Sequence, residues 1–225
     1  MTVNEKKTQL LCVTATNTSL VNTYIRTEGG SKIESQKSLK LLGFYFSDKP
    51  NVTEHITKMA AKFRGRLWFL RHLKKAALPV EDLVHIYSCF LLPILDYASP
   101  VYHPLLTKEQ TQMIERLQAT ALKIIYGWSN SYSSLLNLAG IEYVQERRQR
   151  LTDKFIIKTA ANKRYQEKGF PLKEFVHHDL RKEKYYMEEF ARTDRLYNAP
   201  IFYYRRRLNE IGQTDLNREG PQDRG

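Results

Sequence analysis

The densest group of reactive side chains in this sequence is cationic. Between His55 and Lys75 the chain has seven Lys and Arg residues and no carboxylate. Three of them are spaced at i, i+4 and i+8, so on a helix they share one face. Such a row could contact nucleic-acid phosphates, although an ordinary amphipathic helix has the same pattern. The seven residues are Lys58, Lys62, Arg64, Arg66, Arg71, Lys74 and Lys75, and the row consists of Lys58, Lys62 and Arg66.

Two further cationic clusters follow, one between Arg147 and Lys168 and one at Arg205–Arg207. The whole chain of 225 residues has 36 Lys and Arg against 24 Asp and Glu, a formal charge of +12. Excess charge alone indicates only solubility and non-specific attraction to polyanions. Three clusters in one chain favour a nucleic-acid partner over a merely solvated surface.

Other reactive side chains form no recognisable catalytic set. His177-His178-Asp179 could ligate a metal ion, but no cluster of further ligands stands near it. The carboxylate pairs Glu81-Asp82 and Glu188-Glu189 fall on expected helix faces, where solvation is the simpler interpretation. Because the sequence also has no phosphate-binding glycine loop and no nucleophile elbow, the residues by themselves predict neither a catalytic site nor a metal site in this chain.

Targeting features are also few. The first residues are polar, with no apolar segment of a secretory signal behind them. No apolar run approaches the ~20 residues that cross a bilayer. The two cysteines, Cys12 and Cys89, are far apart in the sequence. We therefore expect a protein of a reducing compartment, cytoplasm or nucleus, that is neither secreted nor in contact with a membrane.

The elements that must position the cations divide into an N-terminal β region and a helical remainder. Alternating and β-branched segments predict strands over 8–15 and 20–27, a hairpin turn over 28–31, and a strand over 39–46 in which Gly43 marks a bulge or a close backbone approach. The fold class predicted is α+β, mostly α, with a small antiparallel β element before a helical bundle. We expect domain ranges of 1–50, 51–168 and 169–225.

Apolar periodicity predicts helices over 52–75, 79–92, 107–127, 131–138 and 143–163. Pro93 is expected to end or kink the second of these, and Pro100 and Pro104 to keep 96–104 out of helix. Periodicity weakens after Gly169, where tyrosines alternate with Lys and Arg, and the residues from Gly212 onward are expected to fray. Trp68 and Trp128 could stack on bases, but we expect them to be core residues.

An ordered series of short segments resembles the reverse transcriptases of non-LTR (LINE-type, Jockey-like) retrotransposons. It runs from about residue 4 to residue 160, and the strength of the resemblance lies in the order and spacing, since no single motif is decisive. The segments are Asn4–Leu10, Leu39–Phe44, His55-Ile56, Ile86–Ser88, Leu92–Tyr102, Ile114–Gly127 and Glu146–Arg148.

The resemblance implies that this chain corresponds to the end of the palm and to the thumb. Lys7 would match a lysine near the leaving pyrophosphate, and Leu42 and Gly43 would match the turn that grips the primer. The helix bearing Lys58, Lys62, Arg64 and Arg66 would match the thumb helix that faces template–primer, and Arg71 and Lys74 lie further along it. An N-terminal surface lysine and a core-closing bulge are equally plausible interpretations of Lys7 and of Leu42-Gly43.

Polymerases of this family hold two Mg²⁺ ions on palm aspartates, including an Asp-Asp pair. This chain has no Asp-Asp pair, so Mg²⁺ would require a palm that it lacks. The expected function is RNA/DNA template–primer binding by a polymerase fragment that is inactive alone. Two alternatives stay open: a helical protein-interaction module without a nucleic-acid role, and a polymerase subunit whose palm comes from a separate chain.

Overall fold

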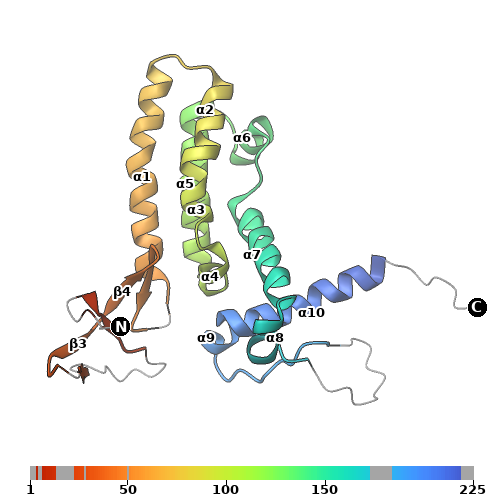
Figure 1. The fold of residues 1–225 in the computed structure, drawn as a ribbon. Coiled ribbons are helices and arrows are strands. Elements are labelled where there is room, and N and C mark those ends of the chain that lie inside the picture. Colours follow the sequence, from red (N-terminus) through yellow and green to blue (C-terminus); the bar gives the residue numbers. More distant parts are fainter. Residues whose placement is uncertain are drawn as a thin grey trace, which may run out of the picture. The chain divides into compact units, whose positions relative to one another are not determined.

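The computed structural model describes residues 4, 7–13, 23–27, 29–49, 51–172 and 184–218. A small β region at the N-terminus precedes a series of helices, so the predicted α+β, mostly α class is confirmed (Figure 1). Contacts group the chain into two compact units, which differ from the three ranges expected from the sequence. Unit 1 is Met1–Leu95 with Lys108–Leu135, and unit 2 is Asp96–Thr107 with Leu136–Gly225.

Two small sheets make up the β region of unit 1. In the first, β3 (Lys32–Gln36) lies between β1 (Leu10–Leu11), which is parallel to it, and β2 (Tyr24–Arg26), which is antiparallel. The expected hairpin between the second and third strands is confirmed by the pairing of Arg26 with Lys32 and by the bond from the Thr27 N–H to the Ser31 carbonyl (3.0 Å). Parts of the first two expected strands lie outside the described residues.

The second sheet corrects the strand predicted over 39–46. That segment is a hairpin of β4 (Ser38–Leu41) and β5 (Phe44–Ser47), in which Leu41 pairs with Phe44. Leu42 and Gly43 form the two-residue turn, with φ of 48° and 84°. Two successive positive φ angles match the turn geometry that suits the twist of a hairpin, and therefore Gly43 reverses the chain instead of forming a bulge.

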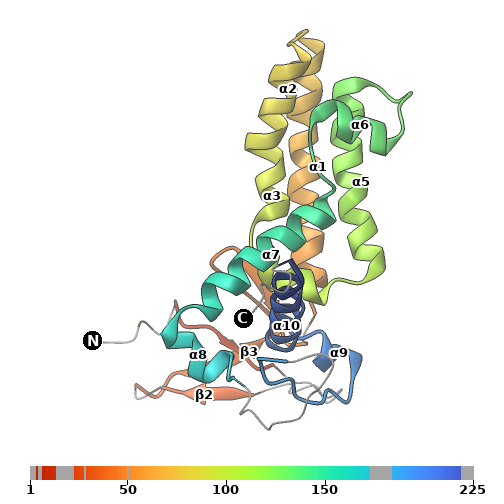
Figure 2. The same ribbon diagram turned by 90° about the vertical axis from the view of Figure 1, so that its right-hand side faces the viewer.

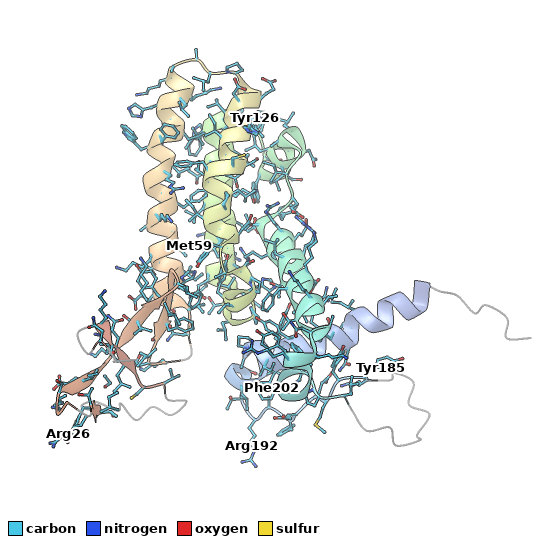
Figure 3. All side chains as sticks on the ribbon, in the orientation of Figure 1. Arg26, Met59, Tyr126, Tyr185, Arg192 and Phe202 are labelled. Carbon is cyan, nitrogen blue, oxygen red and sulfur yellow. The ribbon has the colours of Figure 1, made fainter. Side chains whose placement is uncertain are left out.

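The helices of unit 1 form a bundle. α1 (Thr53–Lys75), α2 (Val80–Ile86) and α5 (Lys108–Tyr126) run side by side, as both views show (Figures 1 and 2). The apolar stripe predicted on α1 faces the bundle, where Met59 lies buried (Figure 3). α5 packs against α1 and buries Ile114, Leu117 and Ala121, which recur at the helical spacing of a buried face.

Pro93 does not end its helix. α2 continues into a π-helical turn, η2 (Tyr87–Leu91), and then into α3 (Leu92–Asp96). Proline removes one backbone donor and its ring clashes with the carbonyl four residues earlier, and a wider turn immediately before it relieves both problems. Tyr87 and Leu91 remain fully buried through this turn.

The prolines at 100 and 104 are also inside helical turns. α4 (Ser99–Tyr102) and the 3-10 turn η3 (His103–Leu105) each have proline in the first turn, where a missing N–H leaves no bond unmade. The residue before α4, Ala98, has a φ of 57° and adopts the left-handed conformation. The expectation that 96–104 would be non-helical was therefore wrong.

Unit 2 is built on α7 (Val144–Ala160) and on a helix that the sequence did not predict. That helix is α10 (Pro200–Arg218), and unit 2 also contains the short helices α8 (Lys163–Gly169) and α9 (Asp194–Tyr197), while α6 (Tyr132–Ala139) is divided between the two units after Leu135. α10 contributes Tyr204 and Leu208 to a core with Ile156, Ala160 and Phe170. The helix extends past Gly212, so the frayed tail expected from that residue was wrong as far as Arg218, and residues 219–225 lie outside the described part.

No single helix among the described residues is both long enough and apolar enough to cross a membrane; Val80–Asp96 reaches that threshold only when taken together with Ser99–Leu105.

Candidate nucleic-acid interface

α1 supports the candidate interface because one side of it is anchored in unit 1. His55, Ile56, Phe63 and Leu70 are among its buried residues. Glu54 lies in the first turn and Lys74 and Lys75 in the last, an arrangement that complements the helix dipole. The sides of the helix that face away from the bundle are consequently available for a ligand.

The cations of α1 lie on two flanks of the helix. Lys58 and Lys62, which we name the lysine row, are one turn apart and exposed. Arg64 and Arg71, also exposed, belong to the other flank and are named the arginine row, because Arg64 follows Lys62 by two residues and so points about 200° away from it. Among the described residues, no carboxylate lies within ion-pair distance of either row.

Arg66, the third member of the predicted cation row, is engaged within unit 1. Its guanidinium lies over the ring of Phe90, 4.1 Å from the centroid, and donates a hydrogen bond to the Phe90 carbonyl (2.8 Å). That carbonyl belongs to the π-helical turn, where the ladder of backbone hydrogen bonds is irregular. Arg66 thus ties α1 to η2, whereas Lys74 is exposed in the last turn of α1.

Trp68 and Trp128 are surface residues, so the expectation that they belong to the core was wrong. Trp68 is 60% exposed and packs on His72, with ring centroids 3.9 Å apart. It follows the buried Leu67 and therefore points about 100° away from the apolar stripe, toward the arginine row. Trp128 is 68% exposed, beneath the ammonium group of Lys123 at 5.3 Å.

The Leu42-Gly43 turn is attached to the start of α1. Phe44, the first residue of β5, is buried and its ring stacks on His55 with centroids 4.1 Å apart. At the turn itself, Leu42 is 85% exposed despite its positive φ. A bulky apolar residue in that conformation costs stability without burying apolar surface in return, a combination that often marks a functional contact.

Replacing Leu42 by Asn is expected to raise the free energy of unfolding by about 1 kcal/mol, because Asn adopts positive φ more readily and Leu42 contributes little burial. Gly43→Ala is the matched opposite, and we expect it to lower stability by a similar amount at a φ of 84°. Urea denaturation measures both changes. Equal stability of the two variants would mean that turn conformation does not limit this hairpin.

Lys7 belongs to the same unit as the turn and α1. It is exposed, three residues before β1, and its N–H donates to the carbonyl of Asn4 (3.1 Å). Through β1 and β3 the N-terminal segment joins the first sheet. Unit 1 therefore contains every residue that the sequence predicted as a contact: Lys7, Leu42, Gly43, Lys58, Lys62, Arg64, Arg66, Arg71 and Lys74.

The second cationic cluster is used in part inside unit 2, while its members Lys154, Lys158, Lys163 and Arg164 are exposed. Arg147 holds Asp96 through two hydrogen bonds of 2.9 Å from its Nε, and Arg150 pairs with Glu142. Arg148 is fully buried. In the third cluster, Arg207 binds Asp153 with both Nε and NH2 (2.9 and 3.0 Å). Ion pairing that the sequence could not reveal thus neutralises Arg147, Arg150, Arg205 and Arg207 within unit 2.

Glu188 and Glu189 lie outside any helix, which corrects their assignment to a helix face, and both are paired with cations. They lie in an extended segment before α9, where Glu188 binds Lys184 (2.7 Å) and Glu189 binds Arg205 (3.1 Å). Glu81 and Asp82 are exposed in the first turn of α2, as expected. His177-His178-Asp179 lies outside the described residues.

In the described ranges, no three His, Cys, Asp or Glu side chains gather closely enough to hold a metal ion. The residues described here therefore do not fit the two-Mg²⁺ centre of a polymerase, and no chemical step is assigned through that metal.

Comparison with known proteins returned no match to a protein-family model, to a curated protein or to a solved structure.

Proposed function

We propose that unit 1 binds an RNA/DNA template–primer duplex, as the palm end and thumb of a reverse transcriptase related to those of non-LTR retrotransposons, and that the chain has no polymerase activity alone. The observation that supports this most is the pair of exposed cationic rows on α1, which have no carboxylate partner among the described residues. Cations held on a rigid helix and not neutralised internally suit contact with phosphates.

The position of the turn adds to the proposal. The Phe44–His55 stack joins the exposed Leu42 to the same helix that bears Lys58 and Lys62. A clamp on a duplex needs contacts with the phosphate backbone and a fixed element that touches the primer end. In this proposal the lysine row supplies the first and Leu42-Gly43 the second.

A salt titration tests the proposal. Six phosphate contacts predict that the logarithm of the association constant for an RNA/DNA hybrid falls against the logarithm of salt concentration with a slope of about −4 to −5. Filter binding with the full chain measures it. Weak binding, or binding that does not change with salt, would contradict the clamp and favour the protein-interaction module, for which exposed Trp68, Phe69 and Phe90 would be the contact residues.

The third possibility, a palm supplied by another chain, makes a separate prediction. Primer extension would then appear only when a palm segment is added to this chain, and hybrid binding alone would not depend on that addition. Extension by the chain without any addition would contradict the proposal that it lacks catalysis.

A further inference from the structure

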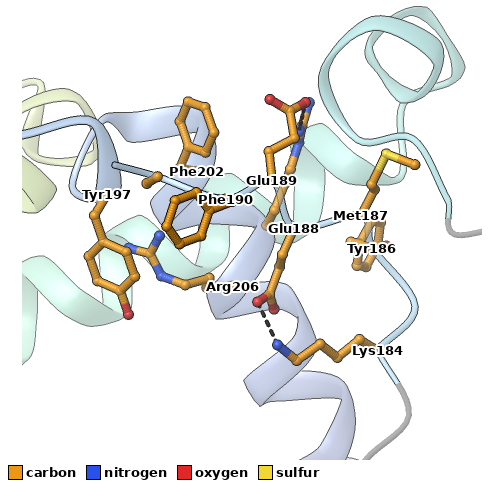
Figure 4. A pocket seen from close by; sticks show the side chains of 11 residues that line it. Lys184, Tyr186, Met187, Glu188, Glu189, Phe190, Tyr197, Phe202 and Arg206 are labelled. Atoms are coloured by element: carbon orange, nitrogen blue, oxygen red, sulfur yellow. Dashed lines mark hydrogen bonds and ion pairs between the residues drawn. The ribbon is translucent and has the colours of Figure 1, made fainter. Parts of the chain in front are cut away.

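Unit 2 has a cavity between the extended segment before α9 and the helix α10 (Figure 4). Its volume is about 570 Å³, within the range of about 300–1,000 Å³ that is typical of sites for small organic groups. Four aromatic side chains line it: Tyr186, Phe190, Tyr197 and Phe202. Phe190 is 86% exposed, so its ring faces solvent and contributes little to the core.

The carboxylates beside the cavity are neutralised by neighbours. Lys184 and the Asn209 amide both bind Glu188, each at 2.7 Å, and Arg205 binds Glu189. Burial by itself would raise the pKa of Glu188, but these hydrogen bonds outweigh it and hold the pKa below its usual value. Both acidic groups of the wall are therefore paired with groups of the protein.

Arg206 is the lining cation that forms no direct ion pair with a described residue, and its positive charge also helps to lower the pKa of the nearby Glu188. Its guanidinium stacks on Tyr197, 3.5 Å from the ring centroid, and Figure 4 shows the two side chains together. Within the described part of unit 2, no carboxylate lies at ion-pair distance from it. A guanidinium that is stacked on a ring keeps its N–H donors at the edge, where they can bind a phosphate or a base.

We propose that this cavity takes an unpaired base of a single-stranded nucleic acid, with the base stacked on Phe190 and Tyr197 and a neighbouring phosphate bound by Arg206. Aromatic faces beside a positive charge are what sequence-tolerant single-strand sites use. The inference extends the proposed function to a second site and a different ligand, because the rows of α1 lie in unit 1 and are assigned to duplex.

An acidic peptide with an aromatic side chain is the competing occupant. The charges favour nucleic acid. Arg206 is the only lining cation without a described carboxylate at ion-pair distance, so it can bind a phosphate. The formal charge of +12 also attracts a single-stranded polyanion more strongly than a short peptide. Stacking between several rings suits a flat base, which can pair its face with a ring while its phosphate reaches the adjacent arginine.

The test compares two probes of equal charge, a fluorescent oligothymidylate and an abasic strand of the same length. Fluorescence anisotropy of the full chain should show about five- to tenfold tighter binding to the strand with bases. Phe190→Ala should abolish that preference, and its exposure makes loss of folding an inadequate explanation. Tyr197→Ala should weaken the preference, whereas Tyr197→Phe, which keeps the ring, should retain it.

Further measurements decide whether the cavity binds a nucleic-acid base or an acidic peptide. Arg206→Gln should lower the salt slope for the single strand by about 1. Equal affinity for the two strands, or an unchanged preference in Phe190→Ala, would overturn the inference. Binding of an acidic aromatic peptide that is lost in Phe190→Ala, without any base preference, would identify a protein-docking site and overturn it as well. Hybrid duplex binding should be the same in Phe190→Ala and in the unaltered chain. The duplex measurement therefore tests the α1 proposal independently of the single-strand site.

Discussion

Reversal of the lysine row, Lys58→Glu with Lys62→Glu, is expected to weaken binding of an RNA/DNA hybrid by roughly 10- to 100-fold at 0.1 M salt and to reduce the salt slope by about 2. Both side chains are exposed, and among the described residues neither is paired with a carboxylate. The change therefore removes two cations that a ligand can use and places two negative charges in their position, at little cost to the bundle.

The arginine row supplies the matched control. Arg64→Glu with Arg71→Glu changes the same number of charges on the same helix but on the opposite flank. Because the proposal gives the phosphate contacts to the lysine row, reversal of that row should weaken binding strongly, whereas reversal of the arginine row should have only the smaller effect of a change in net charge. Lys58→Arg with Lys62→Arg should preserve affinity. Equal and small effects of both reversals would contradict a defined interface on α1.

Acidification from pH 6.5 to pH 4 is expected to lower the free energy of unfolding by about 3 kcal/mol through His55 alone. His55 is buried against Phe44, and burial lowers its pKa from 6.5 to about 4. Between these values the unfolded chain binds a proton at this residue and the folded chain does not. The stabilisation from keeping His55 neutral is therefore fully present above pH 6.5 and is lost as the pH falls through 4.

Chemical denaturation at a series of pH values measures this effect, with His55→Leu as the variant that cannot titrate. Carboxylates also change protonation between pH 6.5 and pH 4. The informative quantity is therefore the difference in the pH dependence of stability between the unaltered chain and His55→Leu. The stability of His55→Leu should fall less steeply with acid. Parallel curves for the two proteins would show that His55 is accessible to protons in the folded state. Because the Phe44–His55 stack joins the hairpin to α1, loss of hybrid binding should accompany acid loss of structure.

Local patterns were most successful where one face of an element is buried. The helix predicted over 52–75 is α1, and the helices over 107–127 and 143–163 are α5 and α7. In each, apolar residues recur at helical spacing, so burial and periodicity give the same answer. The antiparallel pairing of Arg26 with Lys32 was also predictable, since the Gly-rich turn between the strands fixes it.

The predicted helix boundaries at Pro93 and Pro100 differ from those of the structure, because the effect of a proline depends on the conformation of the residues before it. At Pro93 the π-helical turn of η2 absorbs the missing bond, and at Pro100 a residue of positive φ, Ala98, lets a new helix begin. Neither adjustment has a signal in the local sequence. α10 was missed for a related reason: Tyr204 and Leu208 are buried by residues of α7 that are distant in the sequence.

The candidate site was predictable as a set of residues on one helix but not as a surface. Spacing correctly placed Lys58 and Lys62 together, whereas the engagement of Arg66 by Phe90 depends on a turn 24 residues later in the chain. The exposure of Trp68 could have been anticipated, since it stands one residue off the stripe that contains Leu67.

The amino-acid sequence alone determined the class of fold, the main helices and the abundance of positive charge, because each depends on composition or on neighbours within a few turns. Only the tertiary structure decided which cations face solvent and which are paired. Arg147 and Arg207 are held by Asp96 and Asp153, more than fifty residues away in the chain, while Lys58 and Lys62 have no such partner in the described ranges. The energy of a charge depends on the groups that folding places beside it, and sequence proximity does not supply that information.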